Sequence, residues 1–80
     1  MNEYSSLALA VILQAVQDVG AGNGERGRAE MFLRDDEELF FYIDAGQLEL
    51  STHELRREMN TPKLNKQWIN KLRHMRQAAL

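Results

Sequence analysis

The side chains of this 80-residue chain that could take part in chemistry are mostly cations gathered towards its carboxyl end. Residues 51–80 hold seven lysines and arginines against two acids, whereas residues 1–50 hold three against ten acids. Lysine and arginine neutralise phosphates and release the counterions that surround a nucleic acid. We therefore predict a nucleic-acid contact made by Thr52, His53, Arg56, Arg57, Lys63, Lys66, Lys71, Arg73 and Arg76.

The same charge pattern has other interpretations. A chain with one acidic and one basic part also arises when both surfaces are simply solvated. The acids of residues 35–38, with Asp44 and Glu49, could instead dock on a basic protein or imitate the charge of nucleic acid. Such acids more often cap helices and keep a protein soluble. A protein-binding module that acts through an acidic or apolar surface is therefore the alternative function.

Residue types that carry catalysis or hold metals are scarce in the chain. The absence of cysteine excludes a thiol nucleophile, disulfides and thiolate metal ligands. His53 and His74 do not lie four residues apart on one helix, and no Asp or Ser partner is indicated by spacing. The glycines of residues 20–24 do not follow a strand, so they do not indicate a phosphate-binding loop. The sequence predicts a binding protein and not an enzyme, with no cofactor and no metal site.

Residues 39–59 have a layout similar to a helix-turn-helix unit. A first apolar helix would end near Gly46, and a second would begin at the polar Ser51. In this interpretation Leu50, Leu55 and Met59 lock the second helix to the core, while its Thr52, His53, Arg56 and Arg57 point outward. The turn is about three residues longer than the usual one, and two nearby acids, Glu54 and Glu58, would face or border phosphates. Two helices joined by a polar turn also occur in helical domains that bind no DNA.

Five helices are expected to position these residues, over about 4–19, 25–34, 37–45, 52–59 and 62–79. Apolar residues recur at spacings of three and four in the first segment, which predicts the most buried helix. In the last segment, Leu64, Trp68 and Leu72 share one face, so we expect a core Trp68 and not a base-stacking one. The segment 39–43 is also compatible with a strand, since it is short and its residues favour β-structure.

Local signals set the expected helix boundaries. Ser51 and Glu54 fit a reciprocal capping box, and Thr61-Pro62 fits the start of the last helix. The other expected caps are Ser5 or Ser6, Asn23, and Asp35 or Asp36. Glycines at 20, 22 and 24 end the first helix, and Gly46 is predicted as the left-handed residue that stops the third.

The length and the hydropathy of the chain limit the classes of protein to which it can belong. Eighty residues make a single all-α domain, residues 1–80, and a chain this short builds a thin core. The apolar run of residues 7–16 is too short to span a bilayer, which needs roughly 20 apolar residues, and it lacks the flanks of a secretory signal. We expect a compact bundle of four or five short helices in the cytoplasm, without a membrane contact. The thin core and the apolar face of the last helix are compatible with a homodimer.

Three segments carry a resemblance to known proteins. Residues 9–18 read LAVILQAVQD, residues 28–33 read RAEMFL, and residues 42–48 read YIDAGQL. This layout resembles small helical proteins encoded by bacteriophages and prophages, and the stretch after Gly46 departs from it. The resemblance implies a regulatory or accessory protein of a phage, or one that modulates a host or phage machine. It assigns no catalytic or binding residue.

Overall fold

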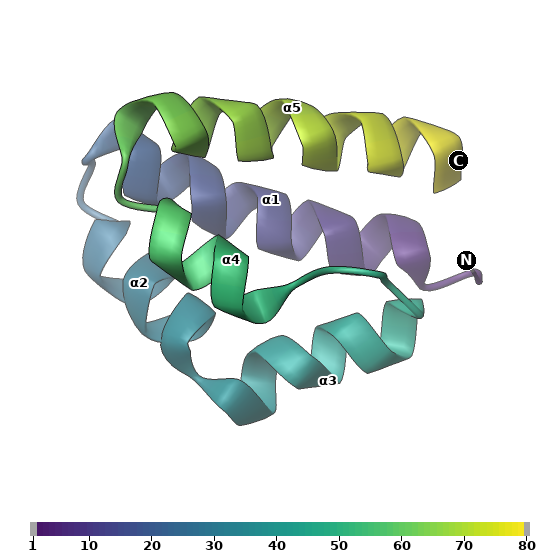
Figure 1. The fold of residues 1–80 in the computed structure, drawn as a ribbon. Helices are drawn as coiled ribbons and strands as arrows, with labels where there is room; N and C mark the ends of the chain where they lie inside the picture. The colour runs from purple at the N-terminus through teal and green to yellow at the C-terminus, as the bar shows by residue number, and fades with distance from the viewer. Residues whose placement is uncertain (1, 80) are drawn as a thin grey trace.

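The computed structural model describes residues 2–79, and they form five helices (Figure 1). These are α1 (Ser5–Ala21), α2 (Arg26–Arg34), α3 (Asp36–Gly46), α4 (Thr52–Glu58) and α5 (Pro62–Ala79). The described residues contain no strand, so the strand alternative for residues 39–43 is wrong. The prediction of an all-α bundle of four or five helices is confirmed.

Helix α1 is the centre of the bundle. It lies between α5 on one side and α2 and α3 on the other, and α5 runs antiparallel to it (Figure 1). Leu9, Ile12 and Val16 of α1 are fully buried, which confirms the prediction that this helix is the most enclosed. Burial of a large aliphatic side chain stabilises a fold by about 1.5–3 kcal/mol. The stripe of α1 therefore organises the core around which the other helices pack.

The two helices of the predicted helix-turn-helix-like segment do follow one another, joined by residues 47–51. They nevertheless use different packing partners. Helix α3 packs on α1 and α2, whereas the main packing partner of α4 is α5. Leu55 and Met59 lock α4 to the core as expected, because both are almost fully buried.

Two predicted helix starts are confirmed. Asp35 caps α3, since its Oδ1 accepts a hydrogen bond from the Glu38 N–H at 3.1 Å. Ser51 caps α4 by accepting from the Glu54 N–H at 3.3 Å. Within residues 2–79, no bond from Glu54 back to Ser51 completes the reciprocal box. Each cap of this kind stabilises a helix by about 1 kcal/mol.

Two other predicted helix caps are wrong, one at Ser5 and one at Asn23. Ser5 does not cap α1, because it is the first residue of the helix and its Oγ accepts from the Asn2 N–H at 2.8 Å. The same hydroxyl donates to the carbonyl of Gly46 at 2.6 Å and so ties α1 to the end of α3. Asn23 accepts from the Glu25 N–H in the turn before α2, where Glu25 and not Asn23 is the cap residue. Gly22 is left-handed at the end of α1, as expected.

Gly46 is not the left-handed stop of α3. It is the last helical residue, and Gln47 takes the left-handed conformation with a φ of 52°. A Cβ at Gly46 would lie 2.8 Å from the Cβ of Ala8, which is far inside van der Waals contact. Glycine at this position therefore allows α3 to approach α1 closely.

The core holds one buried amide, which sequence patterns did not indicate. Asn65 of α5 is 2% exposed, and its Nδ2 donates to the carbonyls of Val16 at 3.0 Å and Met59 at 2.9 Å. These bonds connect α5 to α1 and to the end of α4. A Cβ at Gly20 would collide with the Asn65 side chain, so this glycine leaves room for the amide.

Neither membrane spanning nor metal binding is indicated by the described residues. None of their helices combines the length and the apolar character that crossing a bilayer requires. Residues 2–79 also bring together no group of three His, Asp or Glu side chains that could hold a metal ion.

Candidate nucleic-acid interface

Part of the predicted basic set forms one stripe on α5. Lys66, Asn70, Arg73 and Gln77 follow at steps of four, three and four residues, so they share one side of the helix, and all four are exposed. The opposite side of α5 carries Asn65, Trp68 and Leu72, which are buried. Packing of that inner side thus fixes the stripe on the outer surface.

A groove between α1 and α5 adjoins this stripe. Its volume is about 370 Å³, and no carboxylate is among the side chains that line it. The lining residues are Ala10, Leu13, Gln14 and Gln17 from α1 and Arg73, Arg76 and Gln77 from α5. We call this feature the α1–α5 groove. Its guanidinium and amide groups are hydrogen-bond donors that suit phosphate oxygens.

The donors of the groove differ in their availability. The Gln14 amide donates to Asp18 Oδ1 at 3.0 Å, so this N–H group is already used. Within residues 2–79, Gln17 and Gln77 have no side-chain hydrogen bond, and Arg73 and Arg76 have no carboxylate within 4.0 Å. Among the described residues, the side chains of Arg73, Arg76, Gln17 and Gln77 therefore keep their donors available.

Lys63 and Lys66 are likewise exposed and form no ion pair within residues 2–79.

Lys71 lies outside the groove, beside the ring of Trp68. Its Nζ is 4.5 Å from the centroid of the Trp68 ring, in a hollow that Glu54 and Glu58 also line. Trp68 is only 4% exposed, and its Nε1 donates to Glu58 Oε2 at 2.7 Å, which confirms it as a core residue.

Arg56 of α4 is directed away from the groove. Its Nε donates to the Leu33 carbonyl at 2.8 Å, and its Nη2 lies 2.6 Å from Asp36 Oδ1. The second contact is an ion pair without good hydrogen-bond alignment. Arg56 therefore clamps α4 to the junction of α2 and α3, a role that its position in the sequence did not indicate.

The remaining predicted residues lie in α4. Arg57 is exposed, and its Nη2 is 3.5 Å from Glu58 Oε1. His53 is exposed four residues before Arg57, hence on the same side of α4, and Thr52 is half-buried in the first turn. The structure thus places Arg73 and Arg76 in the lining of the groove and Lys66 on the adjoining stripe, with Lys63 exposed on the same helix. It leaves the α4 residues and Lys71 outside the groove.

No protein-family model, curated protein or solved structure matches this chain. The resemblance to small phage-encoded proteins therefore stays a prediction, and the candidate interface depends on its own geometry. The sequence analysis did not predict that Gln14, Gln17 and Gln77 would line the candidate interface. Gln14 and Gln17 do interrupt the apolar pattern of α1 three residues apart, which was the available signal.

The clamp role of Arg56 predicts a loss of stability without a loss of nucleic-acid binding. Replacing Arg56 by alanine leaves the Leu33 carbonyl without its donor, and we expect the free energy of unfolding to fall by about 1–2 kcal/mol. The ion pair adds little to this, since the Asp36 side chain is 68% exposed. Urea unfolding followed by circular dichroism measures the change. Arg57→Ala is the control and should alter stability by less than about 0.5 kcal/mol; an equal loss in both variants would contradict the clamp.

Proposed function

We propose that this protein binds nucleic acid through the α1–α5 groove and the exposed stripe of α5. The observation that carries the proposal is the groove itself, which Arg73 and Arg76 line together with Gln17 and Gln77, and which no carboxylate side chain of residues 2–79 lines. Arginine pairs with phosphate in a bidentate way, and amide groups add directed hydrogen bonds. The resemblance to phage proteins adds that this is a small regulatory or accessory protein.

The binding mode in this proposal is contact with the backbone of the nucleic acid. Lys66 and Arg73 are seven residues apart, which places them about 10.5 Å apart along the helix axis. That distance corresponds to about three nucleotides of one strand at 3.4 Å each. Arg56 is engaged with Leu33 and Asp36, so it does not supply base contacts from α4. We therefore expect little dependence of affinity on base sequence.

Charge placement supports this orientation. The acids Asp36, Glu37 and Glu38 lie in α3, which packs on the side of α1 that is opposite to α5. A polyanion is thus attracted to α5 and repelled by α3, although the chain carries a net charge of −2. With three or four phosphates neutralised, the slope of log K against log salt should be about −3 to −4.

A charge-reversal pair tests the proposal. Lys66→Glu with Arg73→Glu should weaken binding to a labelled duplex at least tenfold and make the salt slope shallower by about 2. Fluorescence anisotropy at about 50 mM salt, where phosphate contacts are least screened, measures both quantities with duplex and single-stranded DNA. Arg28→Glu with Arg34→Glu is the matched control, because it changes net charge equally on α2.

Two results would count against nucleic-acid binding. The first is undetectable binding of the unmodified protein to either DNA at about 50 mM salt. The second is an equal loss in the α5 pair and the α2 control, since net charge alone would then explain the effect. A preference of more than about tenfold for one base sequence would instead contradict the backbone mode.

A further inference from the structure

A second surface is apolar and lies across α1, α2 and α3. Leu7 of α1 is 64% exposed and Phe41 of α3 is 66% exposed, which is unusual for such large apolar side chains. Tyr4 beside them is also exposed. We call this surface the apolar cradle, and define it as Tyr4, Leu7, Val11, Phe32, Phe41 and Tyr42. Contiguous exposed apolar surface of this kind commonly marks a binding site.

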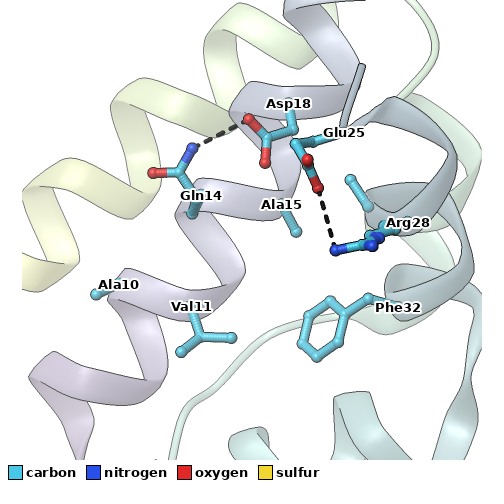
Figure 2. Close-up of a pocket in the computed structure, with 9 residues that line it drawn as sticks. Ala10, Val11, Gln14, Ala15, Asp18, Glu25, Arg28 and Phe32 are labelled. Carbon is cyan, nitrogen blue, oxygen red and sulfur yellow. Dashed lines mark hydrogen bonds and ion pairs between the residues drawn. The ribbon is translucent and has the colours of Figure 1, made fainter. Parts of the chain in front are cut away.

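The cradle consists of three adjoining hollows. The first lies between Leu7, Phe41 and Tyr42 and has a volume of about 420 Å³. The second, also of about 420 Å³, shares Phe41 and Tyr42 with the first. The third, of about 430 Å³, shares Val11 and Phe32 with the second, and Figure 2 shows these two side chains facing one another across it. The hollows therefore form one continuous depression along α1.

Aromatic contacts hold the wall of the cradle in place. The ring centroids of Phe32 and Tyr42 are 5.7 Å apart with an interplanar angle of 62°. Those of Phe41 and Tyr42 are 5.4 Å apart at 86°. Such edge-to-face pairs are favourable geometries for aromatic rings. The exposed Phe41 is thus held in position before any partner arrives, which lowers the entropy lost on binding.

The length of the cradle suits one helix. Its three hollows together follow α1 from Tyr4, just before the helix, to Asp18, through Leu7, Val11 and Gln14 at spacings of three and four residues. Fourteen residues of α-helix rise about 21 Å, or about four turns. An extended depression with apolar pockets is the geometry that receives an amphipathic helix.

The acidic side chains around the cradle determine which kind of partner can bind there. Glu37 and Glu38 line the middle hollow, and Asp18 and Glu25 line the third. Among residues 2–79, Arg28 is the one cationic side chain that lines the three hollows, and its Nη1 is 3.8 Å from Glu25 Oε2 (Figure 2). A second copy of this chain would bring its own acids against this rim, and an anionic membrane would also be repelled. The rim instead complements lysine and arginine.

We propose that the apolar cradle binds a basic amphipathic helix of a partner protein. Apolar side chains of that helix, at spacings of three and four residues, occupy the hollows beside Leu7, Val11 and Phe41. Its lysines or arginines lie over Glu37 and Glu38. This site is separate from the α1–α5 groove, although Ala10 and Gln14 of α1 border both.

The test uses a labelled 18-residue peptide of leucine and lysine, with leucines at helical spacing. We expect binding by fluorescence anisotropy, and at least tenfold weaker binding to the Leu7→Ser, Phe41→Ser variant. The matched control is Met31→Ser with Phe40→Ser, because these side chains are 75% and 44% exposed but line none of the three hollows. All four side chains are exposed, so the fold should tolerate their replacement.

Charge reversal tests the rim. Glu37→Lys with Glu38→Lys should weaken binding of the lysine peptide at least tenfold, whereas Asp44→Lys with Glu49→Lys should change it less than threefold. A peptide with glutamate in place of lysine should show the opposite order of affinities. Asp36 is unsuitable for this test, because it also contacts Arg56 of α4 and its replacement would change two contacts at once.

Three outcomes would overturn the proposal. One is no binding of the peptide at about 1 mM, the weakest affinity that a specific site would have. Another is an equal loss of peptide affinity in the cradle variants and in their controls, which would indicate nonspecific binding. The third is a dimer in sedimentation velocity that is lost in the Leu7→Ser, Phe41→Ser variant, which would make a second copy the occupant.

Discussion

Replacing Asn65 by alanine is expected to lower the free energy of unfolding by about 2–4 kcal/mol, because two buried carbonyls lose their donor. Met59 follows the end of α4, so its carbonyl has no partner from that helix. The Val16 carbonyl keeps the donor of its own helix and contributes less to the loss. For a chain of 80 residues, each kcal/mol corresponds to about 4–8 °C in Tm.

Urea unfolding followed by the fluorescence of Trp68 measures this effect, since it is the only tryptophan and lies in the core. Asn70→Ala on the same helix is the control. Asn70 is exposed, so its replacement should leave stability within about 0.5 kcal/mol of the unmodified protein. A loss below about 1 kcal/mol for Asn65→Ala would show that the two hydrogen bonds do not hold the three helices together.

The neighbouring Gly20 provides a second check on the same contact. Gly20→Ala places a Cβ against the Asn65 side chain, so it should destabilise the unmodified protein. In the Asn65→Ala background the collision disappears, and the same change should cost at least about 0.5 kcal/mol less. Additive effects of the two substitutions would mean that these residues do not touch.

Helix positions were predictable where neighbouring residues determine them. Pro62 fits the first turn of a helix, and the spacing of Leu64, Trp68 and Leu72 gave the length and inner face of α5. Asp35 and Ser51 cap the following helices through bonds that span only three residues. In each case the physical cause lies within one or two turns of the chain.

The wrong boundaries at Ser5 and Gly46 involve partners that are distant in sequence, whereas the one at Asn23 does not. A cap was expected from Ser5, but this residue lies inside α1, where its hydroxyl donates to the Gly46 carbonyl 41 residues away. No sequence pattern indicated that Asn65 is buried, because its burial results from the approach of α1 and of the end of α4. Patterns of period 3.6 do not contain this information.

The candidate interface was also predictable in part, because some of its features follow from local sequence and others from the packing of distant helices. Composition indicated that cations gather at the carboxyl end, and two of them, Arg73 and Arg76, do line a groove beside the stripe that carries Lys66. That groove exists because α1 lies antiparallel beside α5, which brings Gln17 next to residues about sixty positions away. Arg56 resembled an outward recognition residue until Leu33 and Asp36 were seen to engage it. Local spacing thus gives the charge of a surface, whereas packing decides which charges remain free.

Gly46→Ala and Gly27→Ala are expected to change stability in opposite directions. Alanine is favoured over glycine inside a helix by about 1 kcal/mol, because glycine loses more backbone entropy on folding. A Cβ at Gly27 would meet no described atom within 4 Å outside its helix, so this gain should appear as a stabilisation of up to about 1 kcal/mol. Gly27 lies in α2 and serves as the matched control.

At Gly46 the steric cost should exceed that gain. The new Cβ would lie 2.8 Å from the Ala8 Cβ and 3.2 Å from Leu48 Cγ. Ala8 has no rotatable side chain, so the backbones of α1 and α3 must separate, which also stretches the hydrogen bond from Ser5 to the Gly46 carbonyl. We expect a net loss of about 1–3 kcal/mol in urea unfolding.

Adding Ala8→Gly to Gly46→Ala distinguishes this collision from an effect on α3 alone. The second glycine removes the Cβ that the new alanine meets, so the double variant should be more stable than the two separate losses predict, by at least about 0.5 kcal/mol. Strictly additive losses, or a stabilisation by Gly46→Ala like that at Gly27, would mean that α1 and α3 are farther apart at this point.

The close approach of the two helices also shapes the apolar cradle, since Ala8 of α1 and Tyr42 and Ala45 of α3 line its first hollow. Peptide binding by Gly46→Ala should therefore weaken together with its stability, whereas Gly27→Ala should bind as the unmodified protein does.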